Sequence, residues 1–403
     1  MTTMDVMVEA PPAREPGLTR QQYWRSERIW FEGDAYWDGV LADIAAARSS
    51  VDFETYIFTD DALGQRVSTA LMAAADRGVY VRLLVDGVGA GAWVKRRAGE
   101  LQSRQLAVRV FHPLPWLLGA RAYGGASRLA RMFRMLLRVN RRNHRKVCII
   151  DQRLAWVGSF NVSVDHLVSV RCDDCWRDTG ARVEGSAVHE LVDAFAHTWR
   201  RSWRLTRTTM RPPLLWKGHG RRAVSGLVRL NHKLAGRRGM YDELIHRIGH
   251  ARRRVWITAA YFVPNKRLVA ALAQAARNGV DVRLLMPAKS DVLFMPWVSS
   301  AFYQALLAPG VRIYEFQPRI LHAKTLLIDD WLTVGSTNLN YRSLLHDLEA
   351  EVVLLHPRTH RLMERAFLAD LECSREVTLD DWRRRPWLQK WFGRIALRAR
   401  YWL

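Results

Sequence analysis

Two stretches of this sequence repeat the same polar residues at nearly the same spacing: "NHRKVCIIDQRLAWVGSFNVS" (143–163) and "LHAKTLLIDDWLTVGSTNLN" (321–340). A lysine ammonium neutralises the charge of a phosphate group, and serine and asparagine donate hydrogen bonds to its oxygens. Histidine can act as a nucleophile or carry a proton near neutral pH. The repeated residues are His144, Lys146, Asp151, Ser159 and Asn161 in the first stretch, and His322, Lys324, Asp329, Ser336 and Asn338 in the second.

A single His-x-Lys motif would be an ordinary surface strand, but two matching copies indicate one shared catalytic site. If the copies meet at the axis that relates them, their two histidines lie on opposite sides of one phosphorus atom. One histidine can then attack in line while the other protonates the leaving oxygen. The two serines and the two asparagines are the predicted phosphate-binding residues.

Each motif is predicted to form a β-hairpin, because side chains alternate between the two faces of a strand. In the first copy we expect a turn over 151–154, and in the second a turn over 329–331. The one-residue difference between the motifs then falls in the turn. The predicted opposite pairs are Lys146 with Ser159, His144 with Asn161, Lys324 with Ser336, and His322 with Asn338.

The segments before each motif also form a repeat. "ARSSVDFETYIF" (47–58) resembles "ARRRVWITAAYF" (251–262), and "AAADRGVYVRLLV" (73–85) resembles "QAARNGVDVRLLM" (274–286). Each half is therefore predicted to run strand, helix, strand, helix, strand and hairpin. This order indicates an α/β fold of two similar halves, each a mixed β-sheet flanked by helices, with the site at their interface.

The predicted organisation has five parts. They are an N-terminal tail (1–27), a first domain (28–198) with a basic insertion at about 113–139, a basic linker (199–239), a second domain (240–375) and a Trp-rich tail (376–403). The uncharged run 292–311 is interrupted by prolines and polar residues, so we expect it to cover a sheet as helix rather than to span a bilayer. Residues 1–20 lack the apolar core of a signal peptide.

The chain carries 62 Lys and Arg against 39 Asp and Glu, a formal net charge of +23. Such a surface attracts polyanions, which are nucleic acid or anionic lipid. Cys172 and Cys175 form an isolated CxxC with no second pair at zinc-ligand spacing, so no metal site is predicted.

The pattern H-x-K-x4-D followed by G-S-x-N, present twice, resembles that of the phospholipase D superfamily. Over residues 28–375 the chain is similar to the bacterial cardiolipin synthases, especially their B type, through "LLVDGVGA", "WRDTGARVEG", "YFVPN" and "IDDWLTVGSTNLNYRS". The resemblance implies a two-step transfer through a phosphohistidine, without a metal or cofactor.

The resemblance also implies a role for individual residues. By analogy with the family, His144 is the nucleophile and His322 the general acid and then base. Asp178 in "WRDTG" would orient one histidine and Glu349 in "HDLEAEV" the other. Asp151 and Asp329 belong to the catalytic motif, although their place at the hairpin turns predicts that they stabilise turn geometry.

Two basic amphipathic stretches favour lipid over nucleic acid as substrate. "SRLARMFRMLLRV" (127–139) and "WLQKWFGRIALRARYWL" (387–403) each combine an apolar stripe with arginines or lysines opposite. Such helices suit the interface of an anionic bilayer, although most amphipathic helices pack on a protein core. A nucleic-acid groove would be basic and aromatic but would have less use for the apolar stripes.

Three functions follow from these features. The leading one is a cardiolipin-forming transferase that uses phosphatidylglycerol, with phosphatidylglycerol or phosphatidylethanolamine as the second lipid; with water as acceptor the same site is a phospholipase. The second is a phosphodiesterase of DNA or RNA, and the third is a membrane-binding protein with a decayed site, against which both intact motifs count. The predicted partner is an anionic phospholipid membrane, with no obligatory protein partner, and the predicted location is the cytoplasmic face of the bacterial inner membrane.

Overall fold

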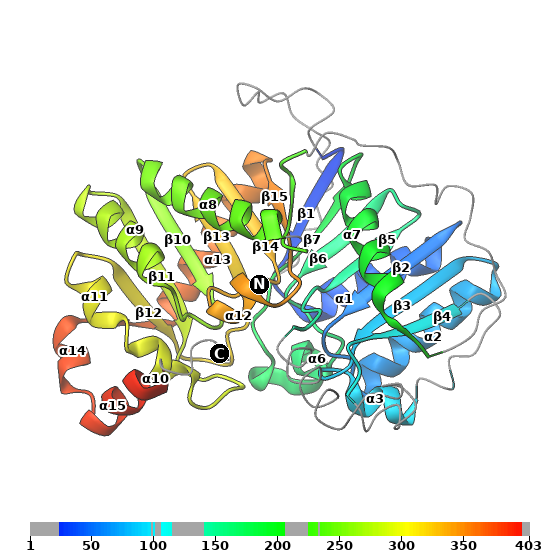
Figure 1. The fold of residues 1–403 in the computed structure, drawn as a ribbon, viewed down its shortest axis with the longest axis horizontal. Helices are drawn as coiled ribbons and strands as arrows, with labels where there is room; N and C mark the ends of the chain where they lie inside the picture. Colours follow the sequence, from blue (N-terminus) through cyan, green and yellow to red (C-terminus); the bar gives the residue numbers. More distant parts are fainter. Residues whose placement is uncertain are drawn as a thin grey trace, which may run out of the picture.

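The computed structural model describes residues 24–97, 100, 106–114, 141–205, 225–232 and 234–396. Within these ranges the chain forms two halves side by side, each built on an eight-stranded mixed sheet (Figure 1). The first sheet has the order β1-β7-β6-β5-β2-β3-β4-β8. Its strands are β1 (Ser26–Trp30), β2 (Ser50–Thr55), β3 (Tyr80–Asp86), β4 (Leu106–Phe111), β5 (Val147–Ile150), β6 (Leu154–Gly158), β7 (Gly180–Glu184) and β8 (Trp203–Arg204).

The second sheet repeats this order strand for strand, β9-β15-β14-β13-β10-β11-β12-β16. In each sheet three neighbouring strands are parallel, β2-β3-β4 and β10-β11-β12, and the other pairings are antiparallel. The predicted fold of two similar mixed-sheet halves is confirmed. The strands are β9 (Val228–Leu230), β10 (Arg254–Ala259), β11 (Asp281–Pro287), β12 (Arg312–Phe316), β13 (Lys324–Ile328), β14 (Trp331–Gly335), β15 (Ala350–Leu354) and β16 (Ser374–Val377).

The helices connect the strands and cover the sheets. In the first half they are α1 (Gly33–Ala46), α2 (Ala62–Asp76), α3 (Gly91–Arg96), α6 (Val168–Arg171) and α7 (Val188–Arg201). In the second they are α8 (Leu234–His250), α9 (Lys266–Arg277), α10 (Met295–Ser300), α11 (Tyr303–Leu307), α12 (Tyr341–Leu345), α13 (Pro357–Glu372), α14 (Leu379–Arg384) and α15 (Trp387–Ala396).

The helices α2 and α9 occupy the same place in the two halves and begin in the same way. The Asp61 side chain accepts a hydrogen bond from the backbone N–H of Gly64, and the Asn265 side chain accepts one from Leu268. Asp and Asn are favoured at this position because they satisfy an N–H group that has no partner within the helix. The repeat therefore extends to how its helices start.

One hydrophobic core joins the two halves. It contains side chains from the inner faces of both sheets, such as Val157 and Val334, together with Phe195 of α7 and Phe367 of α13. Separate clusters fill the outer faces, beneath α1 and α2 in the first half and beneath α8, α9 and α11 in the second. Because the halves share buried apolar surface, they are fixed relative to each other across the interface.

The parallel strands of each sheet end at one edge, which we call the carboxyl edge. The antiparallel neighbours β5 and β13 begin at that edge, since Glu54 pairs with Val147 and Ala259 pairs with Lys324. Ligands of α/β sheets bind outside the carboxyl ends of the strands. Both histidine motifs therefore start where a site is expected.

The predicted hairpins form, but their predicted register is wrong by one residue. Lys146 lies opposite Gly158 instead of Ser159, and the turns have three residues (151–153) and two residues (329–330). The shorter turns are possible because Asp151, Gln152 and Asp329 adopt positive φ angles of 50°, 54° and 48°, which aspartate tolerates better than most residues. The one-residue difference does lie in the turn, as predicted.

Residues 292–311 contain α10 and α11, as expected of helices that cover a sheet. Across the described ranges, no helix has both the length and the apolarity needed to cross a bilayer. The predicted linker 199–239 includes the end of α7, β8, β9 and the start of α8, so both sheets use part of it. The predicted helix at 127–139 and the last residues of the C-terminal stretch lie outside the described residues.

Candidate active site

The two histidine segments meet at the interface between the halves. The backbone N–H of His144 donates to the carbonyl of Leu348 (2.9 Å), and the N–H of His322 donates to the carbonyl of Arg177 (2.9 Å). Parallel bridges join Asn143 to Leu348 and Arg177 to Leu321. Each histidine therefore lies beside the acidic segment of the other half.

The histidine–acid pairs cross the interface. His144 Nδ1 lies 3.1 Å from Glu349 Oε2, and His322 Nδ1 lies 3.1 Å from Asp178 Oδ1. His144 Nδ1 also lies 3.1 Å from the backbone carbonyl of Ser336, which can only accept, so Nδ1 carries the proton. With Nδ1 protonated, Nε2 of the neutral imidazole has a free lone pair and can attack a phosphorus atom.

Both histidines are buried and hold few protons in the free protein. Burial and then the Lys146 ammonium lower the pKa of His144 well below its usual range. Burial and then Lys324 lower the pKa of His322 to about 4. An anionic phosphate would raise both pKa values, because an opposite charge favours the imidazolium.

Each lysine ammonium bonds to the backbone carbonyl of the histidine two residues before it. Lys146 Nζ donates to the carbonyl of His144 (2.8 Å), and Lys324 Nζ donates to the carbonyl of His322. Burial lowers the pKa of Lys146 to about 7 and that of Lys324 to about 8. Both amines therefore titrate near neutral pH and gain charge when an anion enters the site.

Asp178 has a second imidazole partner that sequence reasoning missed. His166 Nδ1 lies 2.8 Å from Asp178 Oδ2, and His166 Nε2 accepts a hydrogen bond from the backbone N–H of Asn161 (3.1 Å). Since Nε2 is an acceptor, the ring proton is on Nδ1, the nitrogen that lies beside Asp178. Burial by itself raises the pKa of Asp178, but His322 and His166 together lower it well below its usual range.

Glu349 bonds to serine hydroxyl groups, whereas the corresponding additional partner of Asp178 is the imidazole of His166. The Ser336 hydroxyl donates to Glu349 Oε2 (2.5 Å), and the Ser343 side chain also bonds to Glu349. Burial raises the pKa of Glu349 to about 7. His166 and Ser343 each lie five residues after the asparagine of their motif, so a comparison of the two copies beyond the asparagine would have found this signal.

The four predicted phosphate-binding residues are buried, and the backbone carbonyl of one of them, Ser336, lies 3.1 Å from His144 Nδ1. The Ser159 hydroxyl donates to the carbonyl of Thr179 (3.1 Å), and the Ser336 hydroxyl is taken by Glu349. Asn161 Oδ1 accepts from the backbone N–H of Ile57, at 3.4 Å, whereas the buried Asn338 Oδ1 has no partner among the described residues. Both serine hydroxyls thus bond to protein groups, and the phosphate-binding role of all four residues stays a prediction.

Asp151 and Asp329 lie at the far ends of the hairpins, away from the histidines. Asp151 Oδ1 accepts from the backbone N–H groups of Ser49 (2.7 Å) and Ser50 (3.0 Å). Asp329 Oδ1 accepts in the same way from Arg253 and Arg254, at 2.9 and 3.0 Å. The two carboxylates therefore tie the turns to the segments that lead into β2 and β10.

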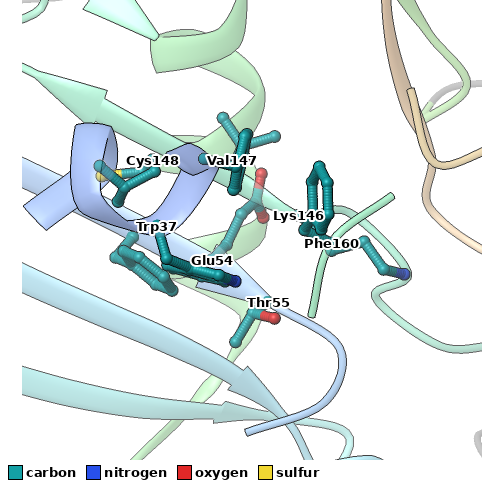
Figure 2. Close-up of a pocket in the computed structure, with 10 residues that line it drawn as sticks. Trp37, Glu54, Thr55, Lys146, Val147, Cys148 and Phe160 are labelled. Atoms are coloured by element: carbon teal, nitrogen blue, oxygen red, sulfur yellow. The ribbon is translucent and has the colours of Figure 1, made fainter. Parts of the chain in front are cut away.

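Buried polar groups also hold the residues on either side of His144. Asn143 Nδ2 donates to Glu54 Oε2 (3.0 Å), and Arg145 lies 3.8 Å from the same carboxylate. Glu54 and Lys146 line a small cavity of about 10 Å³ with aromatic and aliphatic residues, including Trp37 and Phe160 (Figure 2). This cavity has room for no more than about one water molecule, so it is a packing feature rather than a lipid-binding site.

Comparison with known proteins identifies relatives of the chain. The family described as "Cardiolipin synthase, PLD-like domain" matches residues 40–199 and 244–371. Cardiolipin synthase B of Salmonella typhimurium is 32% identical over 342 residues, which cover 81% of this chain and 75% of that protein. The major cardiolipin synthase of Bacillus subtilis is 30% identical over 357 residues, or 87% of this chain and 70% of that protein.

A solved structure shares the fold. Phosphatidylserine synthase of Haemophilus influenzae superposes with a TM-score of 0.66 at 13% identity, covering 94% of this chain and 95% of that one. The family match includes both histidine motifs and both acidic segments that cross the interface. On this basis the chain belongs to the cardiolipin synthase family of phospholipase D-like proteins.

Proposed function

We propose that this protein forms cardiolipin by transferring a phosphatidyl group from phosphatidylglycerol to a hydroxyl of a second phospholipid. Its family makes it a phosphatidyltransferase that acts on phospholipids. The observation that carries the proposal is the pair of crossed histidine–carboxylate contacts, His144 with Glu349 and His322 with Asp178. Such an arrangement suits double displacement at one phosphorus.

In the first step His144 Nε2 attacks the phosphorus of phosphatidylglycerol. A nitrogen–phosphorus bond forms and the bond from phosphorus to the glycerol headgroup oxygen breaks. His322, protonated once the anionic substrate is bound, gives its proton to that oxygen, and free glycerol leaves. Lys146 and Lys324 stabilise the charge that develops on the phosphoryl oxygens.

In the second step the hydroxyl of another phospholipid enters the place that glycerol left. His322, now neutral, takes the hydroxyl proton as the oxygen attacks phosphorus. The nitrogen–phosphorus bond breaks, cardiolipin is released, and both histidines return to their first protonation states. If water enters instead, the product is phosphatidic acid, so exclusion of water favours transfer over hydrolysis.

The same proposal extends to location. A phosphatidyltransferase must reach lipids in a bilayer, and the +23 charge of the chain favours an anionic surface. We therefore infer a peripheral position on the cytoplasmic face of the bacterial inner membrane.

The test is product analysis after incubation of the purified protein with phosphatidylglycerol vesicles, with and without phosphatidylethanolamine. We expect cardiolipin from the native protein and from His250→Ala, a control at an exposed histidine on α8, and none from His144→Ala or His322→Ala. Phosphatidic acid as sole product would establish a hydrolase. Unchanged lipid together with cleavage of a DNA control would refute the proposal.

A further inference from the structure

The surface formed by α10 and α15 exposes large apolar side chains. Six of them lie on these helices and on the residues just before α10, and we call this group the aromatic patch. They are Leu293, Phe294, Trp297, Trp387, Leu388 and Trp391. Leu293 is 87% exposed and Trp387 70% exposed, although side chains of this kind are normally buried. An exposed apolar cluster of this kind marks an interaction surface.

The helix α15 is fixed on α10 by close backbone contact. A Cβ atom at Gly393 would lie 2.7 Å from the Trp297 carbonyl oxygen, so only glycine fits there. The Trp382 indole N–H donates to the Ser300 carbonyl (3.0 Å), which anchors α14, the helix before α15, to the end of α10. The exposed apolar side chains therefore lie on two helices that pack directly against each other.

The aromatic patch lies on the same edge of the molecule as the active site. The segment that leads to α10 follows β11 at the carboxyl edge, and its Asp291 accepts a hydrogen bond from Tyr261 (2.6 Å), whose ring packs near His322. Along this edge α3, α6 and α10 lie in a row (Figure 1). In the first half, exposed Val88 follows the end of β3, and exposed Val168 and Val170 lie on α6.

Charge points to an anionic partner. From Arg383 to the C-terminus the sequence has seven Lys and Arg and no Asp or Glu. Lys289, just before the patch, is exposed as well. Tryptophan and leucine bordered by cations are the residues that bind the interfacial region of a bilayer, where the indole sits between headgroups and acyl chains.

We propose that the aromatic patch on α10 and α15 is the surface by which this protein docks on an anionic phospholipid bilayer, with the carboxyl edge facing the lipid. The inference rests on the proposed function for its purpose, because this orientation delivers headgroups to both histidines. The position of the docking surface is inferred from the exposed apolar side chains and from the cations near them in the sequence.

The experiment compares binding to phosphatidylcholine vesicles, with and without phosphatidylglycerol, by co-sedimentation. The patch variant combines Trp297→Ser, Trp387→Ser and Trp391→Ser, and a milder variant combines Leu293→Ser and Leu388→Ser in case the first does not fold. The control combines Trp203→Ser and Leu368→Ser, two exposed side chains outside the patch. Cardiolipin formation is measured in vesicles and in detergent micelles.

We expect both patch variants to bind phosphatidylglycerol vesicles at least about tenfold more weakly than the native protein and the control. Their activity should fall in vesicles and be kept in micelles, where docking is not needed. Unchanged vesicle binding, or an equal loss in the control, would overturn the proposal. So would a native dimer that the patch variants convert to monomers without a change in vesicle binding, since the partner would then be a second copy.

The design separates this proposal from the proposed function. If the native protein formed no cardiolipin in vesicles or micelles, the proposed function would fail. Patch-dependent binding to anionic vesicles would still support the docking surface.

Discussion

The two histidine–carboxylate pairs have the same geometry but different surroundings. His322 contacts Asp178, whose pKa is held well below its usual range by His322 and His166 despite its burial. His144 contacts Glu349, whose pKa burial raises to about 7. An ionised carboxylate stabilises an imidazolium better than one that is partly protonated. The difference suits His322 for proton transfer and leaves His144 as the neutral nucleophile.

The largest expected effects, and the strongest test of the different roles of the two histidines, come from removing each histidine and varying the leaving group of the substrate. His144→Ala should lose about 10⁵-fold or more in kcat on every substrate, because no phosphohistidine can form. His322→Ala should lose about 10²–10⁴-fold on phosphatidylglycerol. The His322→Ala protein should regain much of the lost kcat on a p-nitrophenyl phosphodiester, because p-nitrophenolate leaves without receiving a proton.

The same variants can be checked by trapping the intermediate with labelled lipid. Label on His144 in the His322→Ala protein would agree with the assignment. Recovery by His144→Ala on the p-nitrophenyl substrate, with label on His322, would reverse the two roles.

Replacing the carboxylates should have unequal effects. Asp178→Asn removes the charge that stabilises the His322 imidazolium, so kcat/KM should fall about 10³–10⁴-fold. Glu349→Gln keeps an acceptor for His144 Nδ1 and removes a carboxyl that is partly protonated at neutral pH, so the loss should be about 10–100-fold. Steady-state kinetics on phosphatidylglycerol micelles measures both, and equal losses would contradict the proposed asymmetry.

His166 should act as a positioning residue through Asp178. His166→Ser copies the hydroxyl found at the equivalent position of the second half, Ser343, and should lower kcat about 10–100-fold. Loss of the imidazole should raise the pKa of Asp178, so the acid limb of the kcat/KM profile should move to higher pH. A variant that lost activity without any shift of the pH profile would indicate a purely structural role for His166.

The two carboxylates should also give the free energy of unfolding opposite dependences on pH, which is the smallest of the expected effects. Because the pKa of Glu349 is raised from 4.5 to about 7, the folded protein holds this proton more tightly, and the free energy of unfolding falls as pH rises between these values. Glu349→Gln should remove that fall, on the order of 1–3 kcal/mol. Asp178 has the opposite sign, since its lowered pKa gives stability that is lost as pH falls.

Urea unfolding between pH 4.5 and 7 measures the Glu349 contribution, and urea unfolding below the ordinary aspartate pKa of 3.8 measures the Asp178 contribution. The difference in unfolding free energy between Glu349→Gln and the native protein should grow from pH 4.5 to 7. The advantage of the native protein over Asp178→Asn should shrink toward low pH. A difference independent of pH for both variants would show that neither carboxyl titrates as described.

The sequence by itself determined the repeat, the α/β class and the ten motif residues. Local patterns carry this information, because apolar strands and the spacing of His, Lys and Asn are properties of short segments. It also pointed to Asp178 and Glu349, through the resemblance of their surroundings to a known family.

Only the tertiary structure decided which carboxylate meets which histidine. Asp178 follows His144 in the chain and Glu349 follows His322, yet each acid contacts the histidine of the other half. The reason is that the pairing depends on a shared core and on backbone bonds such as His144 to Leu348, which join segments about 200 residues apart. Local patterns could not predict the hairpin register or the role of His166 either. The register depends on turn residues with positive φ angles. The role of His166 depends on its contact with Asp178, which forms only in the folded half.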